Sequence, residues 1–345
     1  MKVINQEKVK NYILRLIKNE RKDYVKATIE AYNISKTSVY NYVKQMETDG
    51  LIEKKDNKYI LKNSVYFYSF KNDGTLEEDQ IYNQFISQHI QFKTNVNTIW
   101  NYAFTEMMNN AIEHSESQNI YVSIYQNCLD TKILIVDDGI GIFKNIQRFI
   151  KKTRNEDTPL RECVSLLFAG KFTTAKQFHS GEGIFFTSHI MDEYVIYSDD
   201  NFFTRNNFTS RQIEDSNLHE YMRIKNGTVV RMTLDNNTKK VLSEVFNRYA
   251  PADEGFVKTT IPVAHMFPGG NPVSRSEARR LLGSISLFND IDLDFTGVDE
   301  IGQGFTHEIF VLGKQNYPNI KLNPINMCKT VEDMIKRVVN TANMN

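Results

Sequence analysis

A carboxylate and a carboxamide stand one helical turn apart in the segment FTEMMNNAIEHS, residues 104–115. Glu106 and Asn110 fall at the edge of an apolar helical face, away from its solvent-facing side. A half-buried carboxylate and carboxamide need polar partners. Those partners are either other protein groups or a bound ligand. The apolar face that defines the helix consists of Val96, Ile99, Trp100, Ala103, Phe104, Met107, Met108 and Ala111.

A second group of this kind follows an apolar strand expected at residues 132–138. The strand ends in Asp137-Asp138-Gly139-Ile140-Gly141, a carboxylate followed by two glycines. Glycine there permits a positive φ and the close approach of a ligand. An aspartate at a strand end can accept a hydrogen bond from the exocyclic amine of adenine. Taken alone, a D-x-G-x-G motif is more commonly a simple turn.

A second glycine loop comes about forty residues later, at His179-Ser180-Gly181-Glu182-Gly183. A helical stretch follows it directly. The backbone amides at the beginning of a helix suit the binding of phosphates.

The three motifs in this order resemble the GHKL (Bergerat-fold) family, which includes histidine kinases, DNA gyrase ATPase subunits and anti-sigma-factor kinases. The resemblance implies that residues 95–235 build a pocket for ATP and Mg²⁺. It also implies that Glu106 is a general base in members that hydrolyse ATP or phosphorylate serine. The other implied roles are a magnesium ligand at Asn110, an adenine-binding carboxylate at Asp137, a turn beneath the base at Gly139 and Gly141, a phosphate loop at Gly181 and Gly183, and an adenine-side hydroxyl at Thr228.

The polar segment 151–180 lies where this family carries its ATP lid. Lys171 and Thr174 could contact phosphates there, although a solvated loop explains them equally well. Glu182 departs from the family pattern, since many relatives have a small or neutral residue at that position. A histidine kinase is set aside, because His89 lacks the acidic neighbour of a phosphoacceptor histidine.

The first 63 residues predict a winged helix-turn-helix. Helical spacing of apolar residues, a helix cap at Ser35 and a hairpin around 55–57 support this prediction. Residues 1–62 carry 14 basic and 8 acidic side chains, which favours DNA as a partner. The alternative is a winged helix used for protein contact or dimerisation. The candidate DNA-binding residues are Lys36, Thr37, Ser38, Tyr40, Asn41 and Lys44 on the third helix, with Lys54, Lys55 and Lys58 in the wing.

The last part of the chain, residues 241–345, alternates predicted strands and helices and therefore predicts a small α/β layer. The segment 292–310 resembles STAS-like domains attached to GHKL modules, and in outline anti-anti-sigma factors. Such factors carry a phosphorylatable serine in a loop that here, at 297–304, has no hydroxyl. Asp299 and Glu300 are either solvated or form a docking surface for a protein partner.

The chain of 345 residues balances 42 basic against 42 acidic side chains and has three unpaired-looking cysteines. Without a recognisable signal peptide or membrane span, it is expected in the cytoplasm. The predicted fold class is α+β multidomain: a winged helix at 1–63, an α/β-sandwich GHKL domain at 64–240 and a STAS-like domain at 241–345. Homodimerisation fits a winged-helix regulator, although no motif requires it.

The combination predicts an ATP-responsive, DNA-binding regulator in which the nucleotide state controls the arrangement of the domains. Slow ATP hydrolysis would be compatible with this function. The alternative is a serine/threonine protein kinase of the anti-sigma-factor type, acting on a partner protein.

Overall fold

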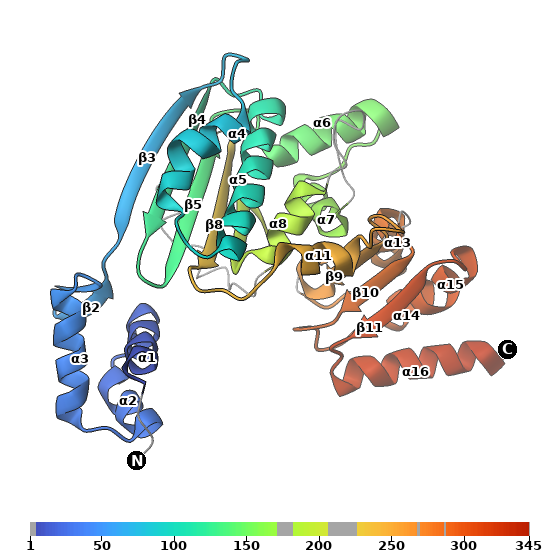
Figure 1. The fold of residues 1–345 in the computed structure, drawn as a ribbon. Coiled ribbons are helices and arrows are strands. Elements are labelled where there is room, and N and C mark those ends of the chain that lie inside the picture. Colours follow the sequence, from blue (N-terminus) through green and yellow to red (C-terminus); the bar gives the residue numbers. More distant parts are fainter. Residues whose placement is uncertain (1–4, 171–181, 206–225, 268–269, 286–287, 345) are drawn as a thin grey trace.

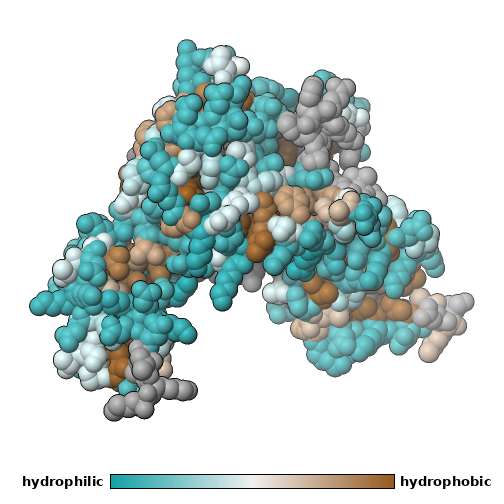
Figure 2. All heavy atoms as spheres, in the orientation of Figure 1, coloured by the Kyte–Doolittle hydropathy of each residue, from teal (hydrophilic) through white to brown (hydrophobic). Residues whose placement is uncertain are grey.

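The computed structural model describes residues 5–170, 182–205, 226–267, 270–285 and 288–344. These residues form several domains of α+β architecture (Figure 1). A six-stranded sheet lies in the middle, and the amino-terminal helices and a carboxy-terminal α/β layer extend from it as separate lobes. The face drawn in Figure 2 is mostly hydrophilic. Every helix in the described ranges falls short of the length or apolar character that a membrane span requires.

The amino-terminal lobe has the predicted arrangement of three helices followed by a hairpin. The side chain of Ser35 caps the third helix by accepting a hydrogen bond from the Ser38 amide at 3.0 Å. Asp56 and Asn57 adopt the positive φ angles that the tight hairpin turn requires. The elements are α1 (Gln6–Lys18), α2 (Tyr24–Tyr32), α3 (Lys36–Thr48), β1 (Ile52–Lys55) and β2 (Lys58–Leu61).

The central sheet has the strand order β3-β4-β5-β8-β6-β7, and all its neighbouring strands are antiparallel. The order places β8 beside β5, although about ninety residues separate them in sequence, so the ends of these strands can build one site. The strands are β3 (Ser64–Lys71), β4 (Asn119–Gln126), β5 (Asp130–Asp137), β6 (Glu193–Ser198), β7 (Asn201–Thr204) and β8 (Thr228–Asp235).

Helices cover one face of this sheet and form its main core. The eight apolar residues predicted to face the core from α5 (Thr94–His114) are all buried, so this prediction is confirmed. The opposite face carries a smaller apolar cluster that includes Leu134, Val136 and Val195. The other helical segments of this region are α4 (Glu78–Ile81), a π-helical turn (Tyr82–Ile86), a 3-10 turn (Ser87–His89), α6 (Ile142–Arg154), α7 (Leu160–Ala169) and α8 (Gly183–Ile190).

The carboxy-terminal layer contains a parallel three-stranded sheet with the order β11-β10-β9. The apolar pattern of residues 256–267 predicts one continuous strand, which is only partly confirmed, because the strand covers Lys258–Pro262 and a helical turn follows. The elements are α11 (Leu242–Tyr249), β9 (Lys258–Pro262), α12 (Val263–Met266), α13 (Arg275–Ile285), β10 (Asp290–Asp294), α14 (Gln303–His307), a π-helical turn (Glu308–Leu312), α15 (Gly313–Asn316), β11 (Lys321–Ile325) and α16 (Lys329–Met344).

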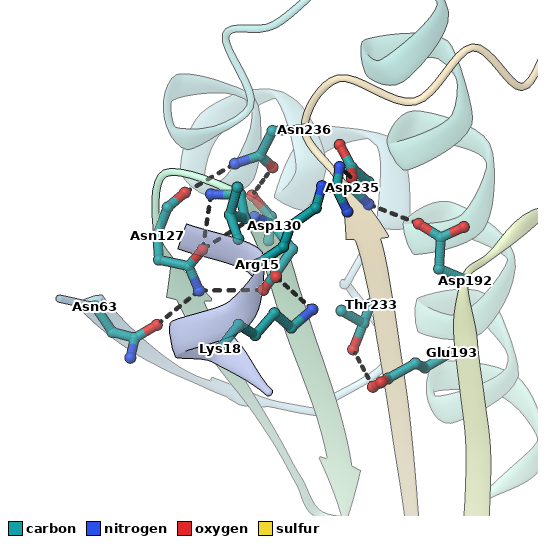
Figure 3. A network of polar contacts seen from close by, with 12 residues as sticks. Arg15, Lys18, Asn63, Asn127, Asp130, Asp192, Glu193, Thr233, Asp235 and Asn236 are labelled. Atoms are coloured by element: carbon teal, nitrogen blue, oxygen red, sulfur yellow. Dashed lines mark hydrogen bonds and ion pairs between the residues drawn. The ribbon is translucent and has the colours of Figure 1, made fainter. Parts of the chain in front are cut away.

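Polar contacts join α1 to the end of the central sheet at which β5 begins (Figure 3). Arg15 pairs with Asp235 at 2.6 Å, and Lys18 lies 2.7 Å from Asp130. Leu129, in the turn between β4 and β5, is buried in the core of the amino-terminal lobe. That lobe therefore contacts the sheet at the opposite end of β5 from Asp137.

Candidate functional site

Asp137 is a buried carboxylate at the end of β5, with only 4% of its surface exposed. One of its oxygens, Oδ1, accepts hydrogen bonds from the backbone amides of Gly139 at 3.0 Å and Thr228 at 3.3 Å. Thr228 begins β8, and the sheet register places it directly opposite Asp137. Two residues that the sequence assigned to one site therefore meet across neighbouring strands.

The Thr228 hydroxyl also holds the start of α6. It accepts a hydrogen bond from the Ile142 amide at 3.1 Å. The preceding residue, Gly227, has a φ of +106°, and a Cβ there would lie 2.0 Å from the Asp137 carbonyl oxygen. Glycine at 227 is therefore required for β8 to begin this close to Asp137.

The two glycines after Asp137 allow close packing of the loop against neighbouring segments. A Cβ at Gly139 would lie 2.0 Å from the carbonyl oxygen of Ser115, the residue that directly follows α5. The same carbonyl oxygen accepts a hydrogen bond from the Ile140 amide at 2.8 Å. Gly141 has a φ of +85°, and a Cβ there would lie 2.5 Å from a carboxylate oxygen of Asp199. The sequence motif predicted a turn after β5, and the structure adds that this turn packs against the end of α5.

Glu106 and Asn110 lie one turn apart on α5, and both are half-buried. A Cβ built at Gly183, the first residue of α8, would lie 2.1 Å from Oε2 of Glu106. The carboxylate of the first motif thus lies against the backbone of the third motif. A side chain at position 183 would have to displace that carboxylate.

Tyr102 and Tyr194 border this carboxylate, although no sequence motif indicated them. Burial, with the nearby charges of Glu106 and Glu182, raises the pKa of Tyr102 well above its usual range. The Tyr194 hydroxyl lies 2.9 Å from the sulfur of Met107. Tyr102 lies one turn before Glu106 on α5, and this i, i+4 spacing is the sequence feature that could have indicated their contact.

The ionisation of Asp137 predicts how stability depends on pH. Burial raises the pKa of Asp137 from 3.8 to about 6, against the hydrogen bonds from Gly139 and Thr228. The folded protein therefore keeps a proton between these pH values that the unfolded chain releases, and its stability falls as the pH rises through this window. The stability of the wild type relative to Asp137→Asn is expected to fall by roughly 2 kcal/mol between pH 4 and pH 7.

Urea unfolding of both proteins without nucleotide, at each pH unit from 4 to 7, measures this difference. Other carboxylates titrate in both proteins, so the comparison isolates residue 137. A difference that stays constant over this range would contradict the raised pKa.

Three candidate phosphate-binding residues, Lys171, Thr174 and Gly181, lie outside the described residues. The expected lid segment 151–180 is not a continuous polar loop, because α7 occupies Leu160–Ala169 within it. Cys163, Leu167 and Phe168 are buried in the central core. The polar flanks concealed this helix in the sequence, since its apolar residues cover fewer than three turns.

The candidate DNA-binding residues lie mostly on the exposed side of α3. Lys36, Thr37, Tyr40, Asn41 and Lys44 are exposed, and Tyr40 keeps 49% of its surface accessible. Ser38 is half-buried, and its hydroxyl lies 2.9 Å from that of Ser35 in the helix cap. Lys54, Lys55 and Lys58 are exposed on the wing. The basic residues are therefore accessible to a partner, whereas the hydroxyl of Ser38 is engaged in the helix cap.

His89 is packed against aromatic side chains. Its Nε2 lies 2.7 Å from the Tyr68 hydroxyl, and its ring stacks on Tyr66 with centroids 3.8 Å apart. Burial lowers the pKa of His89. These contacts fit a packing role.

The two hydroxyls that flank the 297–304 loop are engaged within the protein. The Thr296 hydroxyl donates to Asp294 at 2.7 Å, and the buried Thr306 hydroxyl donates to the Gly302 carbonyl at 2.8 Å. Asp299 and Glu300 are exposed, and the amide of Asp299 bonds to Asn271. The loop therefore presents carboxylates on its surface.

Two family models match the ends of the chain. One, described as an uncharacterized protein conserved in archaea (DUF2250), matches residues 1–71, which include the winged-helix elements and β3. The other, described as a STAS-like domain of unknown function (DUF4325), matches residues 277–332. Comparison with curated proteins gave no match. The carboxy-terminal layer thus contains a STAS-like domain, and the chain is an α+β multidomain protein.

Proposed function

We propose that this chain is an ATP-binding regulator of the GHKL type, with a DNA-binding winged helix, in which the nucleotide state controls the arrangement of the domains. The observation that carries this proposal is that residues far apart in the sequence meet in two pairs. Asp137 lies opposite Thr228 at adjacent strand ends, and Glu106 lies against Gly183. Sequence resemblance alone did not require these contacts.

Adenine is recognised at Asp137. The carboxylate oxygen Oδ1 already accepts the amides of Gly139 and Thr228, so Oδ2 accepts the exocyclic amine of the base. Guanine presents a carbonyl oxygen at the corresponding position, and two acceptors repel each other. The site therefore prefers ATP to GTP.

The phosphates lie toward the beginning of α8, where the backbone amides after Glu182 carry partial positive charge. Asn110 is the residue that would hold Mg²⁺, together with phosphate oxygens. When bound, the ion neutralises phosphate charge. Within the described ranges no three His, Cys, Asp or Glu side chains cluster as a metal site, which fits a metal held largely by the nucleotide.

Calorimetric titration of the full chain with ATP and GTP, each with Mg²⁺, tests the nucleotide proposal. Binding of ATP with at most weak binding of GTP supports it. The absence of ATP binding at millimolar concentration overturns it.

DNA binding is attributed to the basic surface of α3 and the wing. The double variant Lys36→Ala/Lys44→Ala is expected to bind duplex DNA about 10-fold more weakly at 0.1 M salt, and to reduce the slope of log affinity against log salt by about 2, because each lysine contacts one phosphate. Fluorescence anisotropy over a salt series measures both quantities. Lys336→Ala is the matched control, since Lys336 is an exposed lysine on α16.

The same assay tests coupling between the sites. If nucleotide controls the domain arrangement, DNA affinity must differ with and without Mg·ATP. Identical affinities would contradict coupling. An unchanged salt slope in the double variant would contradict the proposed DNA surface.

A further inference from the structure

Arg205 brings a positive charge into the junction between the central sheet and the STAS-like lobe. It follows β7 directly, and its guanidinium lies near the aromatic rings of Phe168, Phe185 and Phe203, with the closest ring centroid, that of Phe185, at 5.0 Å. Burial lowers the pKa of Arg205 to about 10, so the group remains charged at neutral pH. Burying a guanidinium is costly unless its donors are satisfied.

The donors of Arg205 bind three separate elements. Nε donates to the Ser188 hydroxyl in α8 at 3.0 Å, Nη2 to the Phe168 carbonyl in α7 at 2.7 Å, and Nη1 to the Thr260 carbonyl in β9 at 2.9 Å. None of these three acceptors is a carboxylate. The arrangement therefore serves to connect backbone and helix positions rather than to neutralise a neighbouring charge.

Each of the three elements has a defined place in the molecule. Phe168 lies near the end of α7, within the expected lid segment 151–180. Ser188 lies on α8, whose first residue contacts Glu106. Thr260 lies on β9, in the sheet of the STAS-like lobe, where it is paired in register with Asp292 of β10.

Aromatic packing reinforces this junction. Phe185 and Phe186, the third and fourth residues of α8, are fully buried in the core of the carboxy-terminal lobe, against residues such as Tyr249 and Phe256. A Cβ at Gly170 would lie 2.3 Å from the Phe185 ring, so the end of α7 also contacts α8. A shift of α8 on phosphate binding would therefore displace two neighbours, the end of α7 and the core of the carboxy-terminal lobe.

We propose that Arg205 is a positioning residue that transmits the state of the phosphate site to the STAS-like domain, by tying α8 and the end of α7 to β9. This inference rests on the proposed ATP-binding function. Arginine suits the role because its planar group offers five donors in fixed directions and stacks on aromatic rings. Lysine, with a single nitrogen, cannot reach all three acceptors in the same way.

Hydrogen exchange measured by mass spectrometry on the full chain, with and without Mg·ATP, tests the proposal. In the wild type, Mg·ATP is expected to slow amide exchange in α8 and, by about fivefold or more, in β9. In Arg205→Lys and Arg205→Ala the slowing in α8 remains, whereas that in β9 is lost. Arg248→Ala is the matched control, because Arg248 is an exposed arginine at the same junction that stacks on Tyr249, and it keeps both responses.

The outcomes separate the proposals. If Mg·ATP neither binds in calorimetry nor slows exchange in α8, the ATP-binding function fails and this inference fails with it. If Mg·ATP protects α8 but not β9 in the wild type, or protects β9 equally in the Arg205 variants, only the role of Arg205 is overturned. If Arg205→Ala does not fold, as judged by its thermal unfolding, Arg205→Lys and Arg205→Gln decide the question.

Discussion

Asp137→Asn is expected to weaken Mg·ATP binding by about 100-fold, which corresponds to about 2.7 kcal/mol. The asparagine oxygen would keep the hydrogen bonds from the Gly139 and Thr228 amides that Oδ1 accepts in the wild type. Its amide nitrogen would then face the exocyclic amine of adenine, so a donor would meet a donor. The variant thus loses an ionic hydrogen bond and leaves a buried polar group unpaired.

The neighbouring aspartate provides a matched control. Asp138 accepts the amides of Gln118 and Asn119 and the Asn119 side chain, so it holds the start of β4 instead of facing the proposed base. Asp138→Asn keeps the length and removes the same charge, and its Mg·ATP affinity is expected to stay within about threefold of the wild type. Calorimetry measures both variants. Equal losses in both would indicate a general charge effect, and unchanged affinity in Asp137→Asn would remove the adenine-binding role.

The elements that the sequence predicted correctly carry local signals. The apolar spacing along α5 places its whole buried face, and the Ser35 cap places the start of α3. The D-x-G-x-G motif follows a continuous apolar run that forms β5. In each case neighbouring residues are enough to determine the element.

Other features depend on contacts between residues that are distant in sequence, or they go against the structural preference of the local residues. The strand β11 contains Pro324, which is unusual within a sheet, but β11 is an edge strand that tolerates it. Thr330 and Asp333 have the spacing of a capping box, which predicts a helix beginning after Thr330. That prediction is wrong, since α16 already begins at Lys329 and Asp333 pairs with Lys329 at 2.8 Å.

In the candidate site, too, local residues indicate some features and contacts between distant residues determine the others. Residue types and order indicated Glu106, Asp137 and Thr228, but the register that sets Asp137 opposite Thr228 comes from the pairing of distant strands. Likewise, the packing of Phe185 into the carboxy-terminal core depends on how two lobes meet. The sequence of Phe185 and Phe186 does not indicate whether this apolar pair packs into the core of the central domain or into that of the carboxy-terminal lobe.

Glu106→Gln is expected to reduce the rate of phosphate release from ATP by about 100-fold or more, while Mg·ATP affinity stays within about threefold. The Glu106 carboxylate lies against Gly183 at the start of α8, where it can take a proton from a nucleophile that attacks the terminal phosphate. Glutamine preserves shape and hydrogen bonding but cannot accept that proton. Phosphate release under single-turnover conditions and calorimetry measure the two effects separately, with Glu113→Gln on the exposed side of the same helix as control.

The nature of the nucleophile follows from the same variant. With γ-labelled ATP and cell extract, label released as free phosphate indicates that Glu106 activates water, whereas label on a protein indicates a serine or threonine hydroxyl and favours the kinase alternative. Loss of either signal in Glu106→Gln supports the base role, because both reactions remove a proton from the attacking oxygen. A wild-type signal that Glu106→Gln retains in full would show that this carboxylate is not the base, whereas the absence of any signal from the wild type would leave Asn110 and Asp137 in a site that binds nucleotide without turning it over.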